Sequence, residues 1–163
     1  MITGQKKISS EKALHFYRSI LLPRLIEERM LKLLRQNKIS KWFSGIGQEA
    51  VAVGATLATQ KEDVILPMHR NLGVFTTRGV PLYPLFCQLF GKAAGFTQGR
   101  DRSFHFGALD YNIVGMISHL AAMMPVADGI ALAKKLRNQN SIALSFCGEG
   151  ASSEGDCHEA INL

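Results

Sequence analysis

Hydrophobic positions recur every three to four residues through residues 9–36, which predicts one long helix at the start of the chain. Ser9 or Ser10 can cap this helix, and Glu11 falls in its first turn, where a carboxylate is favourable. Pro23 lies in the middle of the segment and lacks the backbone N–H that a helix interior uses. We therefore expect a kink or an interruption at this proline.

Beyond residue 40, helical patterns alternate with two short apolar runs. The runs at 64–70 and 141–147 predict strands, and the helical patterns cover residues 48–59, 71–77, 81–90, 120–135 and 153–163. The first of these helices is rich in Ala and Gly, which indicates close packing against another element. Residues 91–115 form a long glycine-rich connection of the kind that is usually functional or disordered. This alternation predicts an α/β fold, with a parallel sheet flanked by helices on both faces.

Composition and charge exclude several classes of protein. The chain has 163 residues, of which 47% are hydrophobic and 20% charged, as expected for about one globular domain. Its net charge is +6, but the basic residues alternate with acids such as Glu27 and Glu28. This alternation indicates solvated helix faces and argues against nucleic-acid binding. We find neither a membrane-spanning run nor a signal peptide, and the three cysteines have no metal-binding spacing, so we expect reduced thiols in the cytoplasm.

The segment "SFCGEGASSEGD", residues 145–156, carries the clearest chemical signal. It predicts a strand end, a turn with two glycines, and a helix start, which is where α/β sheets bind ligands. Gly148 and Gly150 would let the backbone approach a phosphate, and Glu149 could remain beside that phosphate if Mg²⁺ joined the two. The alternative is an ordinary Gly-acid-Gly turn with no ligand. The glycine spacing matches neither a dinucleotide-binding fingerprint nor a P-loop.

Five segments together resemble a known family. They are "GIGQEAVAVG" (45–54), "HRNLGVFTTRGV" (69–80), "GRDRSFHFG" (99–107), "GMISHLAAMMPVADGIALAKKL" (115–136) and "GEGASSEGDCHEAINL" (148–163). In this order and spacing, they are similar to the α subunit of the thiamine-diphosphate-dependent E1 component of 2-oxo acid dehydrogenase complexes. The resemblance implies a helical segment at 1–40. It also implies the N-terminal part of a thiamine-diphosphate-binding domain at 41–163, which ends inside the cofactor motif.

The resemblance assigns the glycine turn to the cofactor. It implies that Glu149, in the place of the family's usual Asp, coordinates Mg²⁺. The backbone of Gly148, Gly150 and Ala151 would lie along the diphosphate. These roles agree with the chemistry that the turn itself suggests, a diphosphate held through a metal ion.

Two further segments are implied to complete the cofactor site. Arg70 would bind the diphosphate, because a guanidinium matches the geometry of phosphate oxygens. His69 stands where the family usually has Tyr, and would contribute a hydrogen bond. Ser118 and Leu120 lie in the segment whose backbone contacts the aminopyrimidine of the cofactor. His105, by contrast, is expected to be structural.

The implied activity is oxidative decarboxylation of a 2-oxo acid, either branched-chain or pyruvate, with acyl transfer to a lipoyl group on an E2 core. The implied partners are an E1 β subunit or β-like domain and E2, in a homo- or hetero-oligomer. Catalytic residues are expected beyond Leu163 and on the β partner, so the 163-residue chain alone should be inactive and bind cofactor weakly. The alternatives are the α subunit of an acetoin dehydrogenase and a truncated, non-catalytic partner of a β-type chain.

Overall fold

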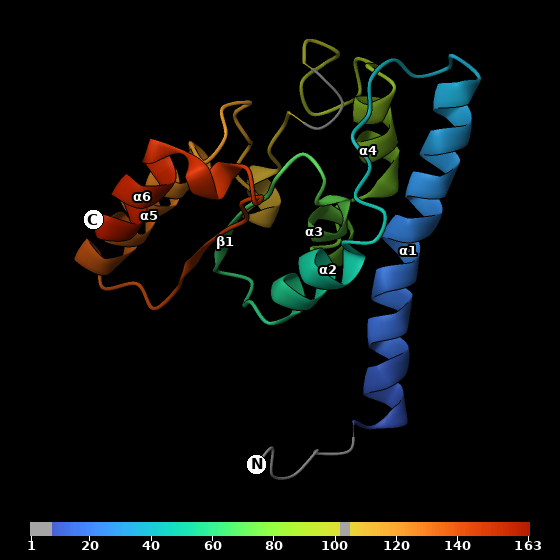
Figure 1. Ribbon diagram of the computed structural model, residues 1–163. Coiled ribbons are helices and arrows are strands. Elements are labelled where there is room, and N and C mark those ends of the chain that lie inside the picture. Colours follow the sequence, from blue (N-terminus) through green and yellow to red (C-terminus); the bar gives the residue numbers. More distant parts are fainter. Residues whose placement is uncertain (1–7, 102–104) are drawn as a thin grey trace.

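The computed structural model describes residues 8–101 and 105–163 and contains two layers of helices with a small sheet between them (Figure 1). The elements in chain order are α1 (Ser10–Arg35), α2 (Glu49–Leu57), β1 (Val64–Leu66), α3 (Leu72–Thr77), α4 (Leu82–Leu89), η1 (Leu109–Tyr111), α5 (Met123–Leu136), β2 (Ala143–Ser145), η2 (Ala151–Ser153) and α6 (Gly155–Asn162). The mixed α/β class predicted from the sequence is confirmed.

Helix α1 is the longest element, and its predicted boundaries are confirmed. The hydroxyl of Ser9 accepts a hydrogen bond from the Lys12 N–H at 3.3 Å and caps the helix. The helix passes through Pro23 without interruption, so of the two expected alternatives the interruption is wrong. Pro23 is buried on the same face as Ile26 and Met30, and burial of its ring offsets the loss of one backbone hydrogen bond. Within the two described ranges, no helix is long and apolar enough to cross a membrane.

Helices α2, α3 and α4 pack with α1 around the main hydrophobic core. Met30, Leu72, Phe75 and Leu85 are among its most deeply buried side chains. A Cβ added to Gly73 of α3 would lie 3.0 Å from Val53 Cγ2 of α2, so these two helices are in close contact. The close packing expected from the Ala and Gly content of α2 is confirmed.

Strands β1 and β2 pair in parallel, with Ile65 opposite Leu144. Ile65 belongs to the core formed with α1 to α4, whereas its neighbour Leu66 packs with Met123 and Ala127 of α5. The two faces of β1 are therefore covered by different helices, as the sequence predicted.

The strands are shorter than expected and the helix starts differ slightly. Both strands end earlier than the apolar runs, because Pro67 cannot donate to a ladder and Gly148 begins a turn.

Pro81 is the N-cap of α4 rather than its first residue. Helix α5 begins at Met123, so residues 117–122 form an irregular segment before it. The loops that follow the two strands are consequently longer, and they meet at one end of the sheet.

The long connection of residues 91–115 is packed in its described parts. The rings of Phe96 and Phe106 stack with centroids 5.0 Å apart, and Ile113 is completely buried. The N–H of Ile65 donates to the Asn112 carbonyl at 2.9 Å, which joins the connection to the edge of β1. The connection therefore completes the core beside the sheet.

Candidate functional site

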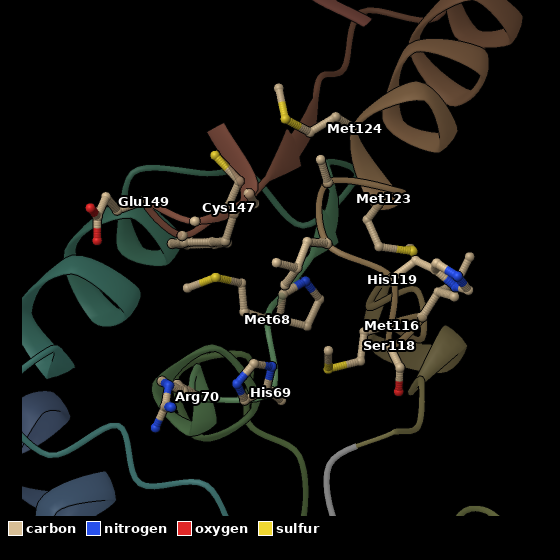
Figure 2. A pocket seen from close by; sticks show the side chains of 18 of the residues that line it. Met68, His69, Arg70, Met116, Ser118, His119, Met123, Met124, Cys147 and Glu149 are labelled. Atoms are coloured by element: carbon tan, nitrogen blue, oxygen red, sulfur yellow. The ribbon is translucent and has the colours of Figure 1, made fainter. Parts of the chain in front are cut away.

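A cavity of about 440 Å³ lies beyond the carboxyl ends of β1 and β2 (Figure 2). It is lined mainly by three segments, residues 67–70, 116–121 and 146–151. All eight residues that the sequence assigned to a cofactor site line this one cavity: His69, Arg70, Ser118, Leu120, Gly148, Glu149, Gly150 and Ala151. The fold therefore brings together residues from three segments that lie far apart in the chain.

The glycine turn lines the cavity and leaves backbone N–H groups unpaired among the described residues. Its carbonyls are used internally, since the Ser152 N–H lies 3.2 Å from the oxygens of Gly148 and Glu149. In the described part of the chain, the amide N–H groups of Gly148, Glu149 and Gly150 donate to no acceptor. A Cβ on Gly148 would come no closer than 3.6 Å to Met68 Sδ, so packing alone does not require a glycine there. Available donors and open space suit the approach of an anion.

Glu149 supplies the only carboxylate of the described cavity lining. It is exposed, and in Figure 2 its carboxylate lies at the edge of the cavity, on the opposite side from Ser118. Among residues 8–101 and 105–163, no three His, Cys, Asp or Glu side chains gather as a metal-binding group. A divalent cation at Glu149 would therefore need most of its ligands from a bound molecule or from water, which is how Mg²⁺ is commonly held beside substrate phosphates.

Arg70 and His69 follow β1 and rest on the aromatic ring of Phe43. The Arg70 Nη1 donates to the Ser44 carbonyl at 2.8 Å, and the Arg70 Cζ lies 5.7 Å from the centre of the Phe43 ring. The His69 ring meets the same phenyl ring edge-on, with centroids 4.7 Å apart. Burial, and secondarily the charges of Arg70 and His105, lower the pKa of His69 below its ordinary value. His69 is thus a neutral hydrogen-bonding group around pH 7, and Arg70 is the cation of this wall.

Ser118 forms a hydrogen bond that sequence reasoning missed. Its Oγ lies 2.7 Å from Nε2 of His105, whose Nδ1 is buried. His105 was expected to have only a structural role, and nothing in the local sequence indicates a contact with a residue 13 positions away. The contact exists because the packed 91–115 connection returns to the cavity just before residues 116–121.

The two sides of the cavity differ in chemistry. Figure 2 shows Arg70 and Glu149 on one side, and Met116, Met123 and Ser118 on the other. Met116 and Met123 also pack in the cluster around Leu66, so this side is rich in apolar, polarisable sulfur, with the polar groups of Ser118 and His119 beside it. The cavity can therefore hold a molecule with an anionic end and an apolar or aromatic body.

Comparison with known proteins gives the family. Residues 17–163 match the family model described as "Dehydrogenase E1 component". The chain is 33% identical over 156 residues to the 2-oxoisovalerate dehydrogenase subunit alpha, mitochondrial, of Bos taurus, which covers 96% of this chain and 34% of that protein. It is 39% identical over 158 residues to the 2-oxoisovalerate dehydrogenase subunit alpha of Bacillus subtilis, covering 96% of this chain and 48% of that protein.

The chain thus spans about a third of the bovine relative and about half of the bacterial one. The matched region includes the entire cavity lining, from Gln48 to Ala151. The family match and the fold agree with the resemblance drawn from the five sequence segments. The chain belongs to the dehydrogenase E1 component family.

Proposed function

We propose that the cavity holds the diphosphate end of thiamine diphosphate, and that the chain is the α part of a 2-oxo acid dehydrogenase E1 component. One observation carries the proposal: the eight residues selected from the sequence, in three separate segments, line a single cavity at the carboxyl ends of parallel strands. The division of this cavity into a polar side, with Arg70, Glu149 and unpaired amides, and a methionine-rich side suits a cofactor with a diphosphate, a bridging cation and an aromatic body.

The residues present fit the cofactor. Arg70 would supply a cation, and the unpaired amides of Gly148 and Gly150 would supply N–H donors, for a diphosphate. Glu149 would coordinate Mg²⁺, which would take further oxygen ligands from the diphosphate. The backbone of Ser118 and Leu120 would contact the aminopyrimidine. Met116 and Met123, which lie across the cavity from Arg70 in Figure 2, would enclose the apolar part. Once bound, thiamine diphosphate supplies the carbanion chemistry that removes CO₂ from a 2-oxo acid.

This chain's residues would anchor and orient the cofactor without transferring a proton. The group that activates the aminopyrimidine is proposed to come from an E1 β subunit or a β-like domain. The acyl group would then pass to a lipoyl group on an E2 partner. The names of the relatives favour a branched-chain 2-oxo acid such as 2-oxoisovalerate as the substrate, and pyruvate is the second candidate.

The test is an activity assay of the full protein assembled with its β partner. We expect CO₂ release from 2-oxoisovalerate that requires thiamine diphosphate and Mg²⁺, with pyruvate used less efficiently in terms of kcat/KM. Preference for pyruvate would correct the substrate, and cleavage of acetoin would favour an acetoin dehydrogenase. An assembled protein that binds thiamine diphosphate but turns over none of these compounds would support a non-catalytic partner and contradict the proposed activity.

A further inference from the structure

The guanidinium of Arg70 is held from behind by the turn at residues 43–45. Its Nη1 donates to the Ser44 carbonyl at 2.8 Å, and its Cζ lies over the Phe43 ring. Arg70 forms no ion pair in the part of the chain that the structure describes. One edge of the guanidinium is therefore fixed by a backbone carbonyl, and its other N–H groups remain available to an anion in the cavity.

The backbone at residues 43–45 is itself held by Glu27, a buried carboxylate on α1. The Oε2 atom of Glu27 accepts hydrogen bonds from the Ser44 hydroxyl at 2.8 Å and from the Gly45 N–H at 2.7 Å. Glu27 is only 2% exposed, so the expectation that it belongs to a solvated helix face is wrong. The hydrogen bonds explain how a carboxylate is tolerated in the interior. Burial nevertheless raises the pKa of Glu27, more than these bonds lower it.

The backbone of Gly45 is closely packed against both Glu27 and Arg70. A Cβ on Gly45 would lie 2.0 Å from the Arg70 carbonyl oxygen and 3.0 Å from Glu27 Oε1. The backbone of the turn is thus enclosed between the Glu27 carboxylate and the Arg70 main chain. A second side chain of α1 acts on the next part of the turn, since Arg24 pairs with Glu49, which accepts from the Gly47 N–H at 2.9 Å.

We propose that Glu27 and Ser44 are positioning residues for Arg70. The carboxylate fixes the turn, and the Ser44 carbonyl fixes the guanidinium so that it can receive a diphosphate. The identity of the ligand, a diphosphate, rests on the proposed function. The positioning of Arg70 by Glu27 through residues 43–45 does not depend on that function. Neither Glu27 nor Ser44 lines the cavity, so any effect of changing them on ligand binding must pass through the turn.

The experiment compares Glu27→Gln with Glu28→Gln in the full assembled protein. Glu28 is the exposed neighbour on the same helix and serves as the matched control. We expect Glu27→Gln to raise the half-saturating concentration of thiamine diphosphate by about tenfold, with kcat at saturation changed by less than about twofold. Glu28→Gln should leave both within about twofold of wild type. An unchanged half-saturating concentration in Glu27→Gln would overturn the proposal.

A double-mutant cycle separates positioning from general destabilisation. In an Arg70→Ala background, Glu27→Gln should weaken cofactor binding by less than about twofold, because the group that it positions is absent. A full additional loss in that background would show that Glu27 acts independently of Arg70. If Glu27→Gln does not fold, Ser44→Ala takes its place, since it removes the hydroxyl and keeps the backbone carbonyl. Ser44→Ala should then weaken cofactor binding by at least about threefold, and this effect should disappear in the Arg70→Ala background.

A second ligand, inorganic pyrophosphate, distinguishes a failure of the positioning role from a failure of the proposed function. Inorganic pyrophosphate is titrated calorimetrically into the same proteins. If wild type binds pyrophosphate but not thiamine diphosphate, the proposed function fails. The positioning role then stands if Glu27→Gln and Arg70→Ala weaken pyrophosphate binding non-additively. If wild type binds neither ligand, or if both substitutions leave pyrophosphate binding unchanged, the positioning role is overturned.

Discussion

Ser118 Oγ lies 2.7 Å from His105 Nε2, and the Nδ1 atom of the same imidazole is buried without a hydrogen-bond partner among the described residues. Nδ1 lacks a partner in either tautomer, but a buried N–H with no acceptor costs about 1–3 kcal/mol and is rarer in proteins than a buried acceptor with no donor. The proton of a neutral His105 should therefore reside on Nε2, where Ser118 Oγ can accept it. The hydroxyl hydrogen of Ser118 is then left to be donated into the cavity.

The tautomer of His105 is directly measurable. In protein with ¹⁵N-labelled histidine at about pH 8, where an ordinary imidazole is neutral, we expect the Nε2–H form of His105 to predominate. Ser118→Ala should reduce that predominance, because Nε2–H loses its acceptor. His158 is exposed on α6 and provides the reference for a freely exchanging imidazole. A proton found mainly on Nδ1 of His105 would contradict the assignment.

Gly45 should be intolerant of any side chain. Its Cβ would overlap the Arg70 carbonyl oxygen at 2.0 Å, and that atom is backbone, so relief requires main-chain movement. We expect Gly45→Ala to lower the free energy of unfolding by about 2–3 kcal/mol, measured by urea denaturation.

Gly54 provides the matched control. It lies within α2, and an added Cβ would meet nothing within 4 Å. Gly54→Ala should raise the free energy of unfolding by about 0.5–1 kcal/mol, because alanine is the better helix former. If the two substitutions have equal effects, the close approach between Gly45 and Arg70 does not exist in solution.

Asp63 should stabilise the sheet in a pH-dependent way. Its carboxylate accepts from the Ile142 N–H at 2.8 Å and the Gln60 N–H at 2.7 Å, so it joins the segments leading into β1 and β2. The Ile142 hydrogen bond is the largest contribution, and the net effect lowers the pKa of Asp63 below its ordinary 3.8. A lowered pKa means that the stabilisation is present above the unfolded-state pKa and is lost as pH falls through the folded-state value.

We therefore expect Asp63→Asn to reduce the free energy of unfolding by about 1–3 kcal/mol at pH 7, where the charged acceptor is lost. The difference from wild type should shrink as the pH is lowered below about 4. Urea denaturation at a series of pH values measures both effects. Glu62→Gln is the control, because Glu62 is an exposed neighbouring acid. A difference that stays constant from pH 7 to the acid range would refute the role of the Asp63 charge.

The helices and the candidate site were predictable because each leaves a local signal. The 3.6-residue period gives α1, and the glycine turn after an apolar run marks a strand end where ligands bind. The family resemblance added His69, Arg70, Ser118 and Leu120, and the structure places all four around one cavity with the turn.

What the sequence concealed depends on contacts between distant segments. Glu27 is surrounded by charged neighbours and looks like a surface acid, yet the turn at 43–45 folds over it and supplies two hydrogen-bond donors. His105 meets Ser118 only because the 91–115 connection packs beside β1. Pro23 leaves α1 intact because its ring is buried on the core-facing side of the helix. Helix propensity alone does not include the free energy gained by that burial.

The proposed roles of Arg70 and Glu149 are to anchor the diphosphate and Mg²⁺ of thiamine diphosphate. Isothermal titration of thiamine diphosphate with Mg²⁺ into the full assembled protein tests these roles most directly. We predict saturable binding that Arg70→Ala and Glu149→Gln each weaken by at least about tenfold, while Glu154→Gln, at an exposed acid five residues beyond Glu149, changes it by less than about twofold. Binding that is equally strong in wild type, Arg70→Ala and Glu149→Gln would contradict the account.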